Sequence, residues 1–195
     1  KEWFRKHYKH WRHKFVPSAL TVKDGVVNYD GNLVIKNIRN VKYPLGVVKG
    51  DLIVDSRSLT TFEKFPKEVG GMLLVMDNYD MKDLKDFDHF PDKVGGSVAI
   101  QDMYLTTFKG IHKKIKKMNG EITISPYFAK TGWTDLLLID GATSIHDYEL
   151  NLSGNDQYKD TWAVMQIISK YMGKGRSGAI DAMSDLVDAG LDDWA

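Results

Sequence analysis

The sequence predicts an α/β solenoid in which short parallel strands stack side by side, with helices at both ends of the stack. Three features indicate this fold: a glycine that recurs along the chain, an alternating run after each glycine, and a second recurring segment between the runs. The glycines lie 19, 21, 25, 24 and 21 residues apart, at Gly31, Gly50, Gly71, Gly96, Gly120 and Gly141. Spacing of this size is typical of proteins that stack one small structural unit on the next.

The runs after the glycines read NLVI, DLIV, MLLV, SVAI, EITI and ATSI. Their second and fourth positions are aliphatic in every case but Thr143. Alternation with a period of two is the pattern of a half-buried strand, because successive side chains point to opposite faces. We therefore expect these pairs to face a common interior, and the strands to lie side by side in chain order. The pairs are Leu33/Ile35, Leu52/Val54, Leu73/Val75, Val98/Ile100, Ile122/Ile124 and Thr143/Ile145.

The segments between the strands carry apolar residues three or four positions apart, as in Leu59, Phe62, Phe65 and Val69. This spacing predicts helical or irregular returns, with prolines such as Pro66 limiting their regularity. Paired glycines end two of the returns, at 70–71 and 95–96. We expect them to adopt the positive φ that turns the chain into the next strand.

The flanks of the repeat predict caps. Residues 1–30 read as a basic amphipathic helix, with its aromatic stripe at Phe4, Tyr8, Trp11 and Phe15, followed by a β-hairpin around Asp24-Gly25. Residues 31–150 form the repeat solenoid, and residues 151–195 form C-terminal helices. The first of these helices is expected to align Tyr158, Trp162, Met165, Ile168 and Met172. The last places Ile180, Met183, Leu186, Val187 and Leu191 on one side and its aspartates on the other.

Composition excludes several classes of protein. The 195 residues are 43% hydrophobic and carry 27 Lys and Arg against 26 Asp and Glu, so a net charge of +1 indicates no polyanionic partner. The chain has no cysteine, which excludes disulfides and thiolate metal sites and fits a reducing compartment. Its apolar runs are too short to span a bilayer. We expect a cytoplasmic protein that does not enter the membrane and needs no cofactor.

Three segments resemble a known family: LTTFEKFPKEVGG (59–71), FDHFPDKVGG (87–96) and LTTFKGIHKKIKKMNG (105–120). They are similar to the LTSLEGAPKEVGG-type repeats of leucine-rich-repeat-like proteins encoded by large tailed bacteriophages. The resemblance covers roughly residues 7–125 and implies a short leucine-rich-repeat-like solenoid in the cytoplasm of a bacterial host. The family's ladder of cysteine and asparagine after each strand is replaced here by DSRS, MDNYD and QDMY. For leucine-rich repeats at large, the resemblance implies protein recognition.

The outward face of the predicted strands carries an apolar centre made of Ile53, Met72, Leu74 and Met76. Exposed apolar patches on soluble proteins usually mark contacts, and methionine adapts to varied partners. We expect a host or phage protein, or a second copy in a homodimer, to bind through this sheet face or through the C-terminal helices. Coverage by a C-terminal helix and simple exposure remain open as alternatives.

Nucleic-acid binding is the second possibility. A cluster of lysines could contact phosphates together with the basic N-terminal helix. The cluster consists of Lys109, Lys113, Lys114, Lys116 and Lys117. The same lysines can equally form the solvated side of a return segment.

The sequence has no phosphate-binding loop, nucleophile elbow, HExxH zinc motif or calcium loop. We therefore expect a protein that is not an enzyme. A third possibility is an enzyme whose chemistry, in the C-terminal region, is not visible as a motif.

Overall fold

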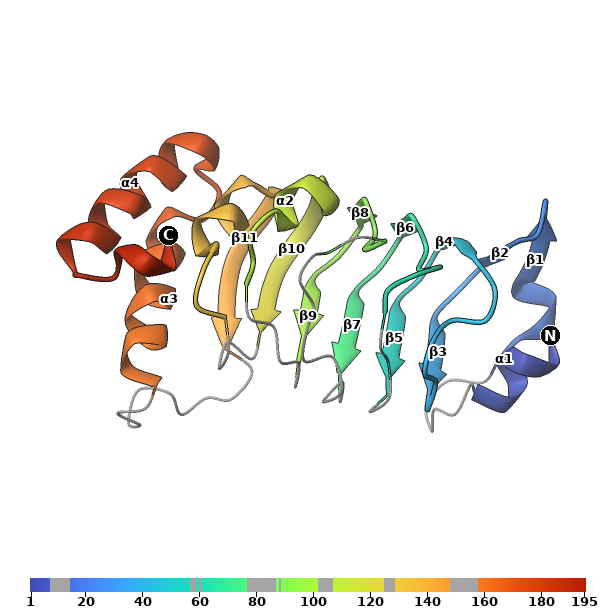
Figure 1. The fold of residues 1–195 in the computed structure, drawn as a ribbon. Coiled ribbons are helices and arrows are strands. Elements are labelled where there is room, and N and C mark those ends of the chain that lie inside the picture. Colours follow the sequence, from blue (N-terminus) through green and yellow to red (C-terminus); the bar gives the residue numbers. More distant parts are fainter. Residues whose placement is uncertain are drawn as a thin grey trace.

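The computed structural model describes residues 1–7, 15–56, 59, 61–76, 87, 89–101, 107–124, 129–147 and 158–195. Figure 1 shows a solenoid of parallel strands with helices at both ends. The strands form one 11-stranded sheet that winds around a continuous apolar core. The predicted fold class is confirmed.

The glycine-led strands form one row of this sheet and pair in parallel in chain order. In register across the row lie Leu33, Leu52, Leu73, Val98 and Ile122. The strands are β3 (Leu33–Lys36), β5 (Leu52–Asp55), β7 (Leu73–Met76), β9 (Val98–Ile100), β10 (Lys117–Ile124) and β11 (Asp140–Asp147).

Eleven of the twelve expected inward positions are buried, each at most 4% exposed. Thr143 is the exception and is exposed, while Ala142 takes an inward position on β11. The register between β10 and β11 shifts near Gly120, so one extra residue on β11 interrupts the alternation between Ala142 and Ile145.

A second row of strands was not expected from the sequence, although its first member, β2, is the second strand of the predicted hairpin. It consists of β2 (Val26–Tyr29), β4 (Leu45–Val48), β6 (Glu68–Val69), β8 (Lys93–Val94) and the start of β10. Val69 and Val94, expected at the ends of the returns, lie in these strands and are buried. Each coil therefore contributes two strand segments that meet at the glycine corner, and β10 runs through both rows.

The paired glycines are needed for a reason other than the expected one. None of Gly70, Gly71, Gly95 and Gly96 has a positive φ, so that prediction was wrong. A Cβ on Gly70 would lie 2.1 Å from the carbonyl oxygen of Lys49, and a Cβ on Gly95 would lie 2.0 Å from that of Gly70. Glycine is required at these corners because the backbones of consecutive coils approach too closely for a side chain.

The returns are mostly irregular. Two equivalent turns close with hydrogen bonds from the Phe65 and Phe90 amides to the Phe62 and Phe87 carbonyls. The buried rings of Phe62 and Phe90 pack edge to face at 4.7 Å between centroids, which joins one return to the next. Later returns contain the short helix α2 (Ile111–Lys114) and the 3₁₀ helix η2 (Trp133–Leu138).

The N-terminal cap contains the helix α1 (Glu2–His7), the 3₁₀ helix η1 (Pro17–Ala19) and the strand β1 (Leu20–Lys23). Strand β1 pairs antiparallel with β2, and Asp24 and Gly25 have φ of 51° and 76°, so the predicted hairpin is confirmed. On α1, Phe4 is buried and stacks on Phe15. Tyr8 and Trp11 of the predicted stripe lie outside the described residues.

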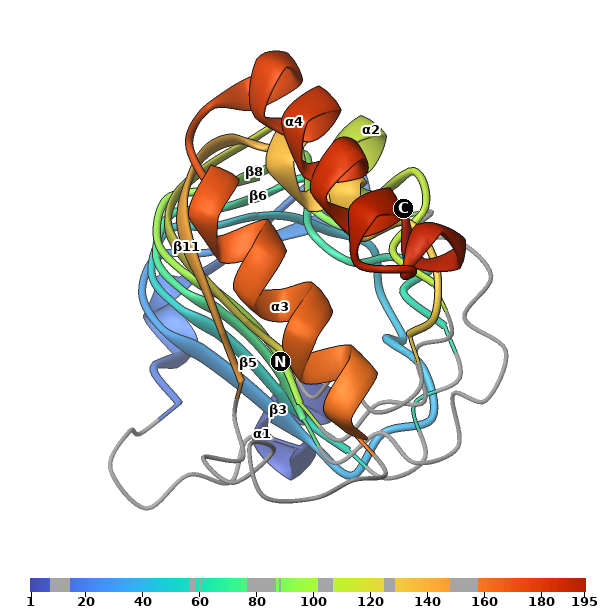
Figure 2. The same cartoon turned by 90° about the vertical axis from the view of Figure 1, so that its left-hand side faces the viewer.

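The C-terminal cap consists of α3 (Lys159–Tyr171), α4 (Gly175–Asp188) and the 3₁₀ helix η5 (Asp192–Trp194). Figure 2 shows α3 and α4 lying across the end of the solenoid. Helix α3 packs on β11 and η2, and α4 packs on η2 and α3. Within the described ranges, no helix is long and apolar enough to cross a membrane.

A polar contact holds the two C-terminal helices together. The Lys170 ammonium and the Tyr171 hydroxyl on α3 both donate hydrogen bonds to the Asp185 carboxylate on α4, each at 2.7 Å. The hydrogen bond from Lys170, with that from Tyr171, lowers the pKa of Asp185. The same bond raises the pKa of Lys170.

Candidate interaction surfaces

The predicted protein-binding residues lie together on the outer face of β5 and β7. Ile53 and Leu74 are directly opposite each other in the parallel register, and Met72 and Met76 flank Leu74 along the chain. All four side chains are half-buried, so the patch is only partly open to solvent. We call Ile53, Met72, Leu74 and Met76 the sheet-face patch.

The neighbours of the patch in the same row are less accessible. Val34 on β3 is 0% exposed and Ala99 on β9 is 7% exposed. Beyond them the row continues to Thr123 on β10, which is polar and half-buried. Helices α3 and α4 pack at the end of the solenoid and not on β5 or β7, so the apolar centre remains a candidate contact surface (Figures 1 and 2).

Polar side chains form a partial ladder at the edge of this face. The Asn32 and Asp51 side chains accept hydrogen bonds from the amides of Asp51 and Met72 in the next coil, at 2.9 and 2.8 Å. Ser97 accepts one from the Glu121 amide at 3.2 Å. The ladder occupies the position directly after each corner glycine, whereas the resembled family has its ladder after the strand. The rung at Met72 is missing because a thioether side chain has no oxygen.

The lysines of the nucleic-acid hypothesis lie on and around α2. Lys109, Lys113, Lys116 and Lys117 are exposed, and Lys114 is half-buried. Their charge is partly balanced, because the Lys116 ammonium lies 3.1 Å from the Asp92 carboxylate. The cluster is therefore brought together by the fold, but it is not purely cationic.

A groove of about 480 Å³ lies next to this lysine segment. Lys64, Lys67, His89 and Lys114 line it together with buried phenylalanines and with Asp92. Lys64 and His89 occupy equivalent places in successive coils and have φ of 70° and 66°. Left-handed backbone is costly for residues other than glycine, so the backbone is strained at Lys64 and His89.

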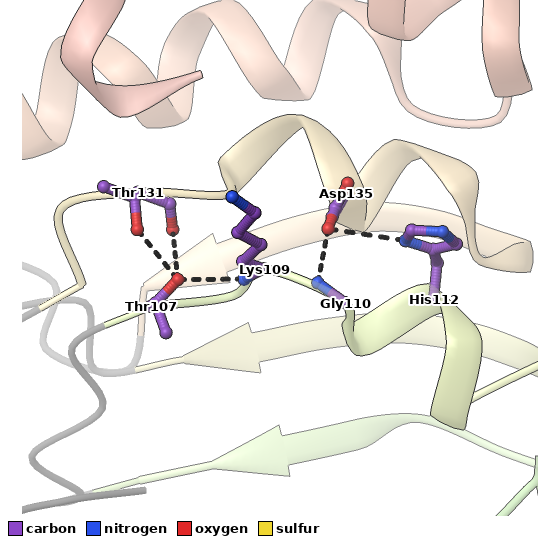
Figure 3. Close-up of polar contacts among 6 residues, drawn as sticks. All are labelled: Thr107, Lys109, Gly110, His112, Thr131 and Asp135. Carbon is purple, nitrogen blue, oxygen red and sulfur yellow. Dashed lines mark hydrogen bonds and ion pairs between the residues drawn. The ribbon is translucent and has the colours of Figure 1, made fainter. Parts of the chain in front are cut away.

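A polar cluster joins the segment before α2 to η2, and no sequence signal pointed to it (Figure 3). Asp135 accepts a hydrogen bond from the Gly110 amide, and its carboxylate lies 3.5 Å from His112 Nδ1. Thr107 Oγ1 accepts a hydrogen bond from the Lys109 amide and lies 2.8 Å from Thr131 Oγ1. The contacts of Asp135 with Gly110 and His112, and of Thr131 with Thr107, join two adjacent coils. The cluster therefore acts as a clamp between these coils.

Helix α4 differs most from expectation. The apolar residues expected on one side of α4 lie on two different sides of the helix. Leu186 is buried, but Ile180, Met183 and Val187 are 60%, 47% and 59% exposed. The buried side consists of Leu186 and the small residues Gly178, Ala179 and Ala182. Small residues face inward because α4 lies close to its neighbours: a Cβ on Gly178 would come within 2.8 Å of the Tyr171 carbonyl oxygen. Trp162, expected on the apolar stripe of α3, is likewise 40% exposed.

The structure therefore offers three candidate contact surfaces: the sheet-face patch, the groove lined by Lys64, Lys67 and Lys114, and the exposed side of α4. Comparison of the chain with protein-family models, with curated proteins and with solved structures found no match.

Proposed function

We propose that this chain is a recognition protein without catalytic activity, which binds another protein through the sheet-face patch. The observation that carries the proposal is the in-register pair Ile53 and Leu74, a partly open apolar site on adjacent strands of a rigid stack. Strands supported on both sides by neighbouring coils move little on binding, so ordering the surface costs little. Flexible methionines at 72 and 76 can then fit the partner's surface.

The resemblance to phage repeat proteins suggests where this function is carried out. In that setting the chain acts in the cytoplasm of an infected bacterium, and its partner is a host protein. The proposal rests on the resemblance of residues 59–71 and 87–96 together with the contact surface, and it assigns no reaction to the chain.

The test is affinity purification from the bacterial host with Leu74→Asp and a matched control. Thr123→Asp introduces the same charge in the same row of the same sheet, outside the patch. We expect one protein to be retained by the parent and by Thr123→Asp and lost with Leu74→Asp, with circular dichroism confirming that both variants fold. Equal retention by all three chains would refute the role of the patch.

Binding of a nucleic acid is the second candidate, and the lysine-lined groove favours it. Four exposed lysines lie beside a concave surface to which Lys64, Lys67 and Lys114 contribute further positive charge. Phosphate contacts of this kind weaken steeply with salt. Excess absorbance of the purified protein at 260 nm would indicate bound nucleic acid. Loss of that excess in high salt, and its absence from a variant with both Lys113→Glu and Lys117→Glu, would support this candidate over protein recognition.

A further inference from the structure

Helix α4 exposes an apolar stripe that the fold does not use. Ile180, Met183 and Val187 are about half exposed or more, and exposed Arg176 continues the same stripe toward the start of the helix. The four positions are spaced by four, three and four residues, which is the spacing of the contact seam between two paired helices. Exposed apolar rows of this kind mark contacts on soluble proteins.

We propose that this stripe pairs with the same stripe of a second copy of the chain, with the two α4 helices antiparallel across a twofold axis. The surface lies on the C-terminal cap, away from the sheet-face patch, and the proposal does not depend on the proposed function. The charge pattern of α4 and η5 indicates that the partner is a second copy of the chain. The charges of two copies are complementary only when their α4 helices run antiparallel.

The two ends of the stripe carry opposite charge. Exposed Lys174 and Arg176 lie at the start of α4, whereas exposed Asp188, Asp192 and Asp193 lie at and beyond its end. An antiparallel pair sets the cations of each copy beside the carboxylates of the other, and it also sets opposite helix dipole ends together. A parallel pair would set cations against cations and carboxylates against carboxylates.

The residues beside the stripe agree with the same orientation. Ser177, Asp181, Ser184 and Asp188 form the adjoining exposed row, again spaced by four, three and four. When Ile180 lies opposite Met183 of the second copy, the antiparallel arrangement brings each aspartate of this row close to a serine hydroxyl. Hydroxyls can donate to carboxylates, whereas in a parallel pair the two copies of this row lie on opposite sides of the seam and do not meet.

The twofold arrangement closes on itself, so it yields a dimer and not a filament. The helix has 14 residues, so the seam is only about 21 Å long. Interfaces of this size belong to the weak, concentration-dependent class. The association must therefore be measured over a wide concentration series.

Sedimentation equilibrium tests whether the stripe is the interface. Val187→Lys removes an exposed valine from the stripe, and Val22→Lys is a matched control on β1, since these valines are 59% and 62% exposed. We expect the mass of the parent and of Val22→Lys to rise with concentration from 22.2 kDa toward twice that value. Loss of one buried valine per copy should weaken the dimer at least about tenfold. A parent that stays monomeric throughout, or a Val187→Lys variant that associates like the parent, would overturn the proposal.

Disulfide trapping tests the orientation, and the absence of cysteine from the chain makes it unambiguous. Arg176→Cys and Val187→Cys, which face each other on the seam when Ile180 lies opposite Met183, should form a linked dimer under mild oxidation only when the two chains are mixed. Each variant alone should remain unlinked, because its cysteines lie at opposite ends of the antiparallel pair. Efficient linkage of Arg176→Cys with itself would show a parallel pair and overturn the assignment.

Discussion

Replacing Gly95 by alanine tests why the corner glycines are required. Its Cβ would lie 2.0 Å from the Gly70 carbonyl oxygen, whereas ordinary contacts begin near 3.4 Å. The neighbouring backbone cannot easily withdraw, because the Gly95 amide donates to the Val69 carbonyl at 2.8 Å and the Gly96 amide donates to the Gly71 carbonyl at 3.0 Å. Overpacking costs about 1–3 kcal/mol. Weakening these two hydrogen bonds adds up to about 1 kcal/mol each, so we expect a loss of about 3 kcal/mol in the free energy of unfolding.

The control is Gly25, where the cause is different. Gly25 has a φ of 76° and nothing within 4 Å of an added Cβ. Alanine there should cost about 1–2 kcal/mol through backbone strain alone. Asparagine, which tolerates the left-handed region, should cost less than alanine at Gly25 but at least as much as alanine at Gly95. Urea unfolding followed by circular dichroism measures all four variants, and a Gly95→Asn chain as stable as the parent would refute the close-approach argument.

Two further predictions concern the turn at Lys64 and the contact of Lys170 and Tyr171 with Asp185. Lys64→Gly should stabilise the chain by about 0.5–1 kcal/mol, because glycine adopts the positive φ of this position without strain. Lys67→Gly lies in the same return at a position where φ is not positive, so it should destabilise the chain. Thermal melts measure both variants, and a loss of stability in both would contradict this reasoning. Asp185→Asn should lower stability at neutral pH. The Asp185 contribution is fully present above the ordinary pKa near 3.8 and is lost as pH falls through the lower folded value, so the difference from the parent in urea unfolding should shrink in acid. A difference that is the same at acid and neutral pH would argue against this role of the Asp185 carboxylate.

The inward row could be predicted because side-chain alternation along a strand is a local property. Leu33/Ile35 and its equivalents needed only a period of two and a repeated glycine to be placed in one interior. The same reasoning missed Thr143, since a register shift between two strands is not encoded in either strand alone. The hairpin at Asp24-Gly25 was predictable for a similar reason, because its turn depends on two adjacent residues.

Ile53 and Leu74 lie on adjacent strands, as the repeat pattern predicts, but their accessibility was not predictable. Whether Ile53 and Leu74 are open depends on what packs above them, which pairing alone does not determine. The lysine segment was also visible in the sequence. Its partner Asp92 comes from the preceding coil, so the partial neutralisation of Lys116 emerges only when the coils stack.

The sequence by itself determined the coil, its interior residues and the presence of caps, because these follow from periodicity and turn chemistry within each repeat. The tertiary structure alone decided three matters: that Gly70 and Gly95 serve close backbone approach, that Asp135 reaches Gly110 and His112, and that α4 buries its small residues. Each depends on the distance between segments remote in sequence. The outward stripe of α4 exists because the space at the end of the solenoid admits Ala182 more readily than Met183.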